Sequence, residues 1–147
     1  MQVLELPPGL SFRHVYSIAT RWSDEDNQSV LNNAVYPTLF EEARLRYFGG
    51  LGQLAEGRFP FLLAQSNVRF RAPGRGGDLM QVEMATTHVG RSSFEQAYRV
   101  LSPEGELLCE AQALLVTYDP ATNKSAPMGD AFRASLMGAD PEAEDRR

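Results

Sequence analysis

One stretch decides the fold, because it is the only long helical pattern in the chain: residues 36–50 read YPTLFEEARLRYFGG. Its apolar residues recur at spacings of three and four, which places them on one face of an α-helix; they are Tyr36, Leu39, Phe40, Ala43 and Tyr47. Pro37 is tolerated only in a first turn, so we expect the helix to begin near residues 33–35. Asn32 or Asn33 would cap it, and the final glycine pair would end it.

Alternating patterns on either side of this helix predict five β-strands. Apolar and polar residues alternate with period two, which is typical of a half-buried sheet; the expected strands are 12–20, 62–71, 79–88, 92–101 and 106–118. The last is apolar on both faces, so it is expected to be central and covered. One helix buries its stripe under five strands only if the sheet curls. The sequence therefore predicts an α+β fold, with a curled antiparallel sheet of about five strands wrapped around one long helix.

Composition restricts the kinds of chemistry available to the chain. The length of 147 residues suits one domain, and the formal charge of −5 argues against a nucleic-acid partner. No apolar stretch is long enough to insert into a membrane, and no signal peptide is visible. A single cysteine, Cys109, excludes an intramolecular disulfide and a Cys-based zinc site. That cysteine usage suits a reducing cytoplasm. With only His14 and His88 as histidines, little histidine or cysteine chemistry is expected.

The densest group of acidic residues lies just before the helix, where residues 21–26 read RWSDED. Acids near a helix start are often there only because they interact favourably with the helix dipole. A carboxylate beside the exposed N–H groups of a helix start is also the arrangement of a nucleophile or base next to an oxyanion site. Composition alone favours the first interpretation, and the combination of residues keeps the second open.

The loop and the helix start together resemble the hot-dog-fold acyl-CoA thioesterases of the 4-hydroxybenzoyl-CoA thioesterase type. The matching pattern is Arg-Trp-x-Asp-x-Asp at 21–26, Asn-Asn-Ala-x-Tyr at 32–36 and Phe-Glu-Glu-Ala-Arg at 40–44. Weaker matches follow at 68–73, 77–79 and 90–94, and the resemblance covers roughly residues 12–135. It implies one hot-dog domain over residues 1–138. The charged segment 139–147 is expected to be a disordered tail.

The resemblance implies an activity, which is hydrolysis of an acyl-CoA thioester to the free acid and coenzyme A. Asp26 matches the family's catalytic carboxylate and would act as nucleophile or as general base; the sequence does not separate these roles. The backbone N–H of Asn33 matches the donor that polarises the thioester carbonyl. Asp24 would then be a structural partner that shapes the loop.

Further expectations concern the substrate and the assembly. Arg91, Ser92 and Tyr36 are the candidate substrate-binding residues, and Arg91 would meet the phosphates of coenzyme A, because a guanidinium binds phosphate with two parallel hydrogen bonds. No metal and no cofactor are expected, since coenzyme A enters as part of the substrate. The resemblance implies a homodimer or homotetramer whose active sites lie between subunits.

Two positions depart from the Gly-His-Val-Asn pattern of many relatives, because Ser29 stands at the glycine and Val30 at the histidine. If the first position requires a positive φ, serine is strained there. The departures motivate an alternative function, a hot-dog protein that binds acyl thioesters without hydrolysing them. A hot-dog hydratase or dehydratase ranks last, because such enzymes typically need a histidine and neither histidine is near the helix start in sequence.

Two helix residues, Glu41 and Glu42, compete with the loop carboxylate, because some hot-dog thioesterases carry their catalytic glutamate on the helix. Helical charge runs are usually solvated, so we expect both glutamates on an exposed face, paired with Arg44 and Arg46. Trp22 is expected to pack under the loop, with one face free to line an acyl pocket.

Overall fold

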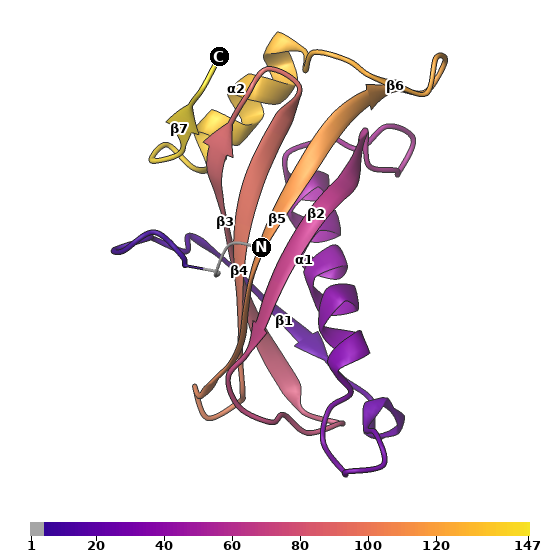
Figure 1. Ribbon diagram of the computed structural model, residues 1–147, viewed down its shortest axis with the longest axis vertical. Coiled ribbons are helices and arrows are strands. Elements are labelled where there is room, and N and C mark those ends of the chain that lie inside the picture. Colours follow the sequence, from indigo (N-terminus) through magenta and orange to yellow (C-terminus); the bar gives the residue numbers. More distant parts are fainter. Residues whose placement is uncertain (1–4) are drawn as a thin grey trace.

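The computed structural model describes residues 5–147 and shows a mainly antiparallel sheet that curls around a long helix (Figure 1). The strands lie in the order β1-β3-β4-β5-β2, and the short strands β6 and β7 join β5 and β3. The strand bounds are β1 His14–Ala19, β2 Phe61–Phe70, β3 Leu79–Val89, β4 Ser93–Leu101, β5 Leu107–Asp119, β6 Lys124–Ser125 and β7 Glu144–Asp145. The predicted α+β class and the five predicted strands are confirmed.

Helix α1 spans Tyr36–Gly50, and a short 3-10 helix at Asn33–Val35 leads into it. Pro37 therefore lies in the first turn, as its missing N–H requires. The side chain of Asn32 caps the short helix by accepting a hydrogen bond from the N–H of Ala34 at 3.0 Å. Of the two candidate caps, the first is the one that the chain uses.

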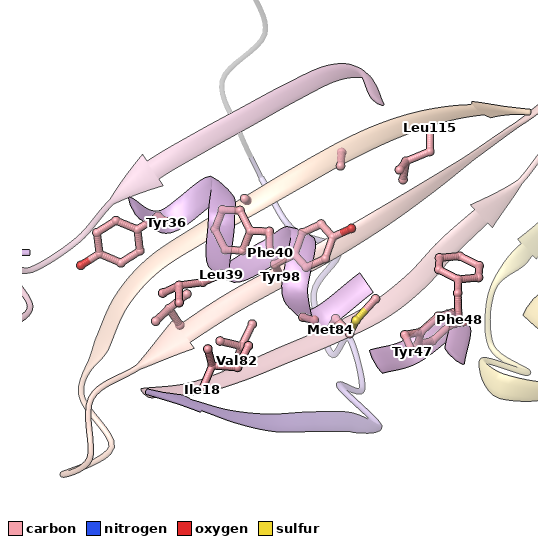
Figure 2. Packing of buried hydrophobic residues seen from close by; sticks show 14 of the residues in the cluster. Ile18, Tyr36, Leu39, Phe40, Tyr47, Phe48, Val82, Met84, Tyr98 and Leu115 are labelled. Carbon is pink, nitrogen blue, oxygen red and sulfur yellow. The ribbon is translucent and has the colours of Figure 1, made fainter. Parts of the chain in front are cut away.

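The apolar face of α1 packs into the concave side of the sheet, as Figure 2 shows. Phe40 stacks on Tyr98 of β4, with ring centroids 5.1 Å apart. Burying each large apolar side chain stabilises the fold by about 1.5–3 kcal/mol. All five residues of the predicted stripe are buried here: Tyr36, Leu39, Phe40, Ala43 and Tyr47.

Strand β5 lies between β4 and β2, as its apolar character on both faces predicted. Small residues on its concave face lie opposite large residues of β4: Ala111 pairs with Tyr98, and Ala113 pairs with Gln96. Small side chains in the central strand leave room for the larger ones that fill the space below α1.

Strand β2 forms a free edge of the sheet, because within residues 5–147 it pairs only with β5. Leu62 and Leu63 on this strand are 59% and 50% exposed. A long unpaired strand is a template for pairing with another chain, and exposed apolar side chains on it mark an interaction surface.

The chain after β6 continues into helix α2, Asp130–Ala139, which the sequence patterns did not predict. Phe132 and Leu136 of α2 are buried. The helix lies at one end of the sheet, beside the turn between β3 and β4 (Figure 1). The ring of Phe132 stacks on that of Phe48 in α1, with centroids 5.7 Å apart. Neither helix within residues 5–147 is long and apolar enough to cross a bilayer.

The expected disorder of residues 139–147 differs from the structure, in which this segment lies against β3. The side chain of Asp140 is buried and accepts a hydrogen bond from the hydroxyl of Tyr47 at 2.8 Å. Strand β7 pairs with the end of β3, and Asp145 forms an ion pair with Arg133 of α2. The charges of the tail thus meet complementary groups from distant parts of the chain, which a count of charged residues does not reveal.

Candidate active site

The acidic loop folds as a tight hairpin directly before the helix. The N–H of Asp26 donates to the carbonyl of Val30 at 2.9 Å, and the N–H of Asn32 donates to the carbonyl of Asp24 at 2.9 Å. Between these bonds an isolated antiparallel bridge joins Glu25 to Leu31. The hairpin fixes the position of the acidic residues relative to the first turn of the helix.

The hairpin turns at Ser29, whose φ of +61° lies in the left-handed region. Its N–H donates to the carbonyl of Asp26 at 3.1 Å and closes the turn. This position therefore does require a positive φ, where glycine is unstrained and serine costs about 1–2 kcal/mol. The chain keeps the loop geometry and stores strain at its tip.

Asp26 is half-buried, and its carboxylate is held by one hydrogen bond. Its Oδ1 accepts from the backbone N–H of Gln28 at 2.7 Å. Among residues 5–147 no donor reaches its Oδ2. One carboxylate oxygen is thus anchored to the loop and the other is available for a ligand.

Asp24 is committed to the loop itself. Its Oδ2 accepts from the backbone N–H of Arg21 at 2.9 Å, and its Oδ1 accepts from the guanidinium of the same arginine at 2.9 Å. The backbone hydrogen bond and then the side-chain bonds from Arg21 lower the pKa of Asp24. The two aspartates therefore differ, since one is saturated by Arg21 and the other is largely unpaired.

The backbone N–H of Asn33 begins the short helix and lacks a hydrogen-bond acceptor among residues 5–147. The next two N–H groups are used, because Ala34 donates to the side chain of Asn32 and Val35 donates to its carbonyl. The first N–H groups of a helix carry partial positive charge and face outward. Asn33 thus presents an unpaired donor one residue after the hairpin closes.

Loop 72–77 supports the hairpin from below. The N–H of Leu31 donates to the carbonyl of Gly74 at 2.8 Å, and the N–H of Gly76 donates to the carboxylate of Glu25 at 3.0 Å. A Cβ on Gly76 would lie 2.5 Å from the carbonyl oxygen of Arg21, so only glycine fits. The sequence patterns did not mark this segment as part of the site. Its three glycines within four residues were the available signal.

Tyr36 lies beneath the hairpin and is buried. Its ring meets that of Phe70 edge to face at 5.4 Å. A Cβ on Gly74 would lie 3.0 Å from the Tyr36 hydroxyl, which makes glycine the fitting residue there. Burial raises the pKa of Tyr36 to about 12, so the hydroxyl stays protonated at neutral pH. Tyr36 thus lies against the loop that supports the hairpin, since the N–H of Leu31 donates to the carbonyl of Gly74.

Arg91 and Ser92 lie at the other end of the sheet, in the turn between β3 and β4 (Figure 1). Strand β3 separates this turn from the hairpin, and its 11 residues span roughly 35 Å at about 3.3 Å per residue. Their carbonyls accept from Met128 and Thr117. One chain by itself therefore does not bring Arg91 and Ser92 to Asp26.

The helix glutamates behave differently from one another. Glu42 forms the expected ion pair with Arg46 at 3.3 Å. Glu41 is exposed and forms no ion pair within residues 5–147. The expected pairing of Arg44 on an exposed face is wrong, because Arg44 is 5% exposed and donates to the hydroxyl of Tyr98 at 3.1 Å.

Trp22 is also placed differently from expectation. Its side chain is 81% exposed instead of packed under the loop. The space beneath the hairpin is filled by Leu31, which is 2% exposed, so the indole has no apolar pocket to enter.

The remaining candidates for histidine or thiol chemistry lie away from the hairpin. His14 contacts Asp140 and the ring of Tyr47, and His88 lies between Glu95 and Glu144. Cys109 is buried, which raises the pKa of its thiol to about 12. Over the part of the chain that the structure describes, no group of three His, Cys, Asp or Glu side chains is arranged to hold a metal ion.

Comparison with known proteins identifies the family. The family described as the thioesterase-like superfamily matches residues 20–136. The chain is 27% identical over 114 residues to the acyl-CoA thioester hydrolase YbgC of Escherichia coli, covering 74% of this chain and 84% of that protein.

Solved structures give the same picture. A thioesterase from Thermus thermophilus, complexed with coenzyme A and Zn, superposes with a TM-score of 0.77 at 29% identity, over 86% of this chain and 94% of that chain. A 1,4-dihydroxy-2-naphthoyl-CoA thioesterase from Synechocystis superposes with a TM-score of 0.75 at 19% identity, over 84% and 94% of the two chains. The second likeness concerns the fold alone and confirms the predicted hot-dog architecture.

Proposed function

The chain belongs to the thioesterase-like superfamily, and on that premise we propose that it hydrolyses an acyl-CoA thioester at the hairpin, with Asp26 as the reacting carboxylate. The N–H of Asn33 would hold the carbonyl oxygen of the substrate. One observation carries the proposal: a carboxylate oxygen and a helix N–H, both without a hydrogen-bond partner in the described part of the chain, lie on either side of the same hairpin closure.

The N–H of Asn33 supplies the electrostatic part of the reaction. As the thioester carbon becomes tetrahedral, negative charge develops on its oxygen, and a preorganised N–H at a helix start stabilises that charge. Removing one such donor in other enzymes costs about 10²–10³ in turnover. This donor is part of the backbone, so substitution of the Asn33 side chain leaves it in place.

Asp26 supplies the other part in one of two ways. As nucleophile, its Oδ2 attacks the carbonyl carbon, the C–S bond breaks, and the departing thiolate takes a proton from water. Water then cleaves the resulting anhydride to the free acid and restores the carboxylate. As general base, Asp26 takes a proton from the attacking water and passes it to the thiolate.

The free edge of β2 suggests how a second subunit would bring its Arg91 close to the hairpin. The Phe70 end of β2 contacts Tyr36 below the hairpin, whereas Phe61 at the other end pairs with Thr117, which donates to the carbonyl of Ser92. Antiparallel pairing of two β2 strands about a two-fold axis sets the Phe61 end of one chain beside the Phe70 end of the other.

In such a homodimer, Arg91 of the partner subunit would lie at the same end of the sheet as the hairpin of the first chain. A guanidinium there would bind the phosphates of coenzyme A. The site is therefore incomplete in one chain. Arg91→Gln should raise the KM for acyl-CoA and leave unchanged the KM for a short thioester that lacks the coenzyme A phosphates.

The proposal is tested by Asp26→Asn in a thiol-release assay with a panel of acyl-CoA substrates. We expect loss of at least about 10³-fold in kcat with an unchanged melting temperature, because the amide neither attacks nor accepts the proton. Glu41→Gln and Glu42→Gln are the controls and should retain activity. Near-full activity of Asp26→Asn with loss in Glu41→Gln would move the reaction to the helix.

A single turnover in ¹⁸O-labelled water then separates the two roles of Asp26. Label found in the Asp26 carboxylate by peptide mass spectrometry identifies the nucleophile. A label-free Asp26 with labelled free acid is expected of the general base, and also of an anhydride that water opens at the acyl carbon; mass spectrometry of the rapidly quenched enzyme separates these, because only the nucleophile gives an acylated Asp26.

A second function is kept because of the strained Ser29 and the apolar Val30 at the hairpin tip. A protein of this fold that binds acyl thioesters without turnover would accept such a loop, because the reacting geometry is then irrelevant. Calorimetric binding of acyl-CoA without thiol release would support this function. Thiol release at a rate well above the background reaction rules it out.

A further inference from the structure

Arg44 is a buried cation without an anionic partner among residues 5–147. It lies in the middle of α1, is 5% exposed, and its guanidinium lies over the ring of Tyr98 at 5.5 Å from the ring centre. Burying a charge without a counter-ion is costly, so a buried guanidinium normally meets a carboxylate or phosphate.

One N–H of Arg44 begins a buried chain of hydrogen bonds. It donates to the hydroxyl of Tyr98 at 3.1 Å, and that hydroxyl donates to Oε1 of Gln96 at 2.5 Å. The amide of Gln96 then donates to Oγ1 of Thr86 at 3.1 Å. Each acceptor in this half of the chain is filled by the group before it.

The second half of the chain ends on Asp140. The hydroxyl of Tyr47 donates to the Asp140 carboxylate at 2.8 Å, so the hydroxyl of Thr86, 2.9 Å from Tyr47, must donate in turn to Tyr47. All donors therefore run in one direction, from the guanidinium to the carboxylate. Within this network only one N–H of Arg44 donates a hydrogen bond.

The other N–H groups of Arg44 face a cleft. Among the described residues no fully buried side-chain nitrogen or oxygen lacks a partner, so the unpaired nitrogens of Arg44 must reach accessible space. A cleft of about 120 Å³ adjoins them between α1 and the edge strand β2. Leu63 and Ser66 line it from the strand, and Pro37 and Phe40 line it from the helix.

This cleft lies on the same side of the helix as the proposed oxyanion donor, the N–H of Asn33. Asn33, Pro37, Glu41 and Arg44 follow one another at spacings of four, four and three, which places them along one side of the helix. At about 1.5 Å per residue, and with the arginine side chain leaning toward the helix start, the donor and the guanidinium are separated by roughly 10–15 Å. That is the span of an acyl chain of moderate length.

We propose that Arg44 binds a carboxylate at the far end of the acyl group, so that the preferred substrates are ω-carboxyacyl-CoA thioesters. The inference rests on the proposed function, because it takes the thioester carbonyl to lie at Asn33. A guanidinium matches a carboxylate with two parallel hydrogen bonds, and burial strengthens the pair.

Glu41 lines the same cleft, and its negative charge repels an incoming carboxylate. Glu41 is exposed, so water and salt screen its charge, whereas the charge of Arg44 acts from a buried position of lower dielectric. The balance favours an anion at the Arg44 side of the cleft.

The test measures selectivity between matched substrates. Thiol release is followed with adipoyl-CoA against hexanoyl-CoA, and with suberoyl-CoA against octanoyl-CoA. The wild-type protein should prefer the carboxylated member of at least one pair. Arg44→Gln should lower kcat/KM for that member at least about tenfold and leave its uncharged counterpart within about twofold.

Two variants act as controls. Arg46→Gln makes the same chemical change on an exposed position of α1 and should leave the selectivity ratio unchanged. Arg44→Lys keeps the charge without the planar fork and should fall between the other two. The ratio compares two substrates on one preparation, so a smaller folded fraction does not alter it.

Several outcomes overturn the inference. These are a wild-type preference for the uncharged acyl group in both pairs, an equal loss for both members in Arg44→Gln, or a loss of dimer in sedimentation velocity without a change of selectivity. The last would mean that a carboxylate of the partner subunit occupies the cleft. Failure of the proposed function is seen separately. An active Asp26→Asn variant would show that Asp26 is not the reacting group, whereas the selectivity ratio of that variant would be unchanged.

Discussion

The two ends of the curled sheet are constructed from different kinds of interaction (Figure 1). At the α2 end, five phenylalanine rings pack at centroid separations between 4.8 and 6.4 Å: Phe48, Phe59, Phe61, Phe94 and Phe132. At the hairpin end, backbone hydrogen bonds hold a polar loop that contains a strained serine and an unpaired helix N–H. The comparison teaches that packing stabilises one end of this thioester hydrolase, whereas the other end keeps a carboxylate oxygen and a helix N–H that have no partner among residues 5–147.

The largest expected effect breaks the packed end. Phe48→Ala should lower the free energy of unfolding by about 3–5 kcal/mol, because Phe48 is fully buried among four other rings. Urea denaturation followed by fluorescence measures the change. Leu45→Ala, on the exposed side of the same helix, is the control and should stay within about 0.5 kcal/mol. At a temperature where both variants are folded, turnover should be close to wild type, and a large loss of turnover would contradict the separation of the two ends.

The next effect breaks the hairpin end. Gly76→Ala places a Cβ 2.5 Å from the carbonyl oxygen of Arg21 and must displace the hairpin. A displacement of about 1 Å in a reacting group costs roughly 10²-fold in rate, so kcat/KM should fall by that order in the thiol-release assay. Gly50→Ala, where nothing lies within 4 Å of the added Cβ, is the matched control. Equal activity of both variants would mean that the hairpin does not hold the reacting groups.

A smaller effect sharpens the comparison by removing the stored strain. Ser29→Gly should raise the free energy of unfolding by about 0.5–1 kcal/mol, because glycine relieves the strain at a φ of +61° but loses more backbone entropy on folding, which offsets part of the gain. Thermal and urea unfolding measure it. The same substitution at Ser135, within α2, should destabilise by about 0.5–1 kcal/mol, since glycine is unfavourable inside a helix. A destabilised Ser29→Gly would show that the serine side chain supports the turn.

The smallest effect concerns the segment that closes the packed end. Hydrogen bonding to Asp140 raises the pKa of His14 above its ordinary value of 6.5, although burial and Arg13 act in the opposite direction. The protonated form therefore stabilises the folded state, fully below pH 6.5, and this contribution is lost as the pH rises through the folded-state pKa. The free energy of unfolding of wild type relative to His14→Gln should thus be larger at pH 5.5 than at pH 8.5. A difference that is independent of pH would contradict it.

Local patterns predicted the helix and strands that need only an apolar surface to pack against. The stripe of α1 and the alternation in β3, β4 and β5 need only an apolar surface opposite them, so periodicity located them within one or two residues. Helix α2 and the docked tail depend on particular distant groups, such as Tyr47 for Asp140 and β3 for β7. Such partners are brought together by the fold and leave no signal in the neighbouring sequence.

The candidate site divides in the same way. The hairpin and the helix start are contiguous in sequence, so the family motif could be matched there and predicted Asp26 and Asn33 as site residues. The spacing of Arg44 from Glu41 suggested an exposed ion pair, because spacing alone does not say which side of the helix the sheet covers. The family resemblance predicted Arg91 in the same site as Asp26, and within one chain the length of β3 separates the two residues.

The unequal covering of the sheet edges has a consequence for assembly. Strand β1 covers only part of β3, Arg46 of α1 donates to the Ser17 carbonyl on β1 at 2.9 Å, and β7 pairs with the far end of β3. Strand β2 is left as the one long edge without a covering element within residues 5–147. If two subunits pair through this edge, as proposed above, the contact uses the β2 edge of both copies, so it closes at two copies and does not propagate into a filament.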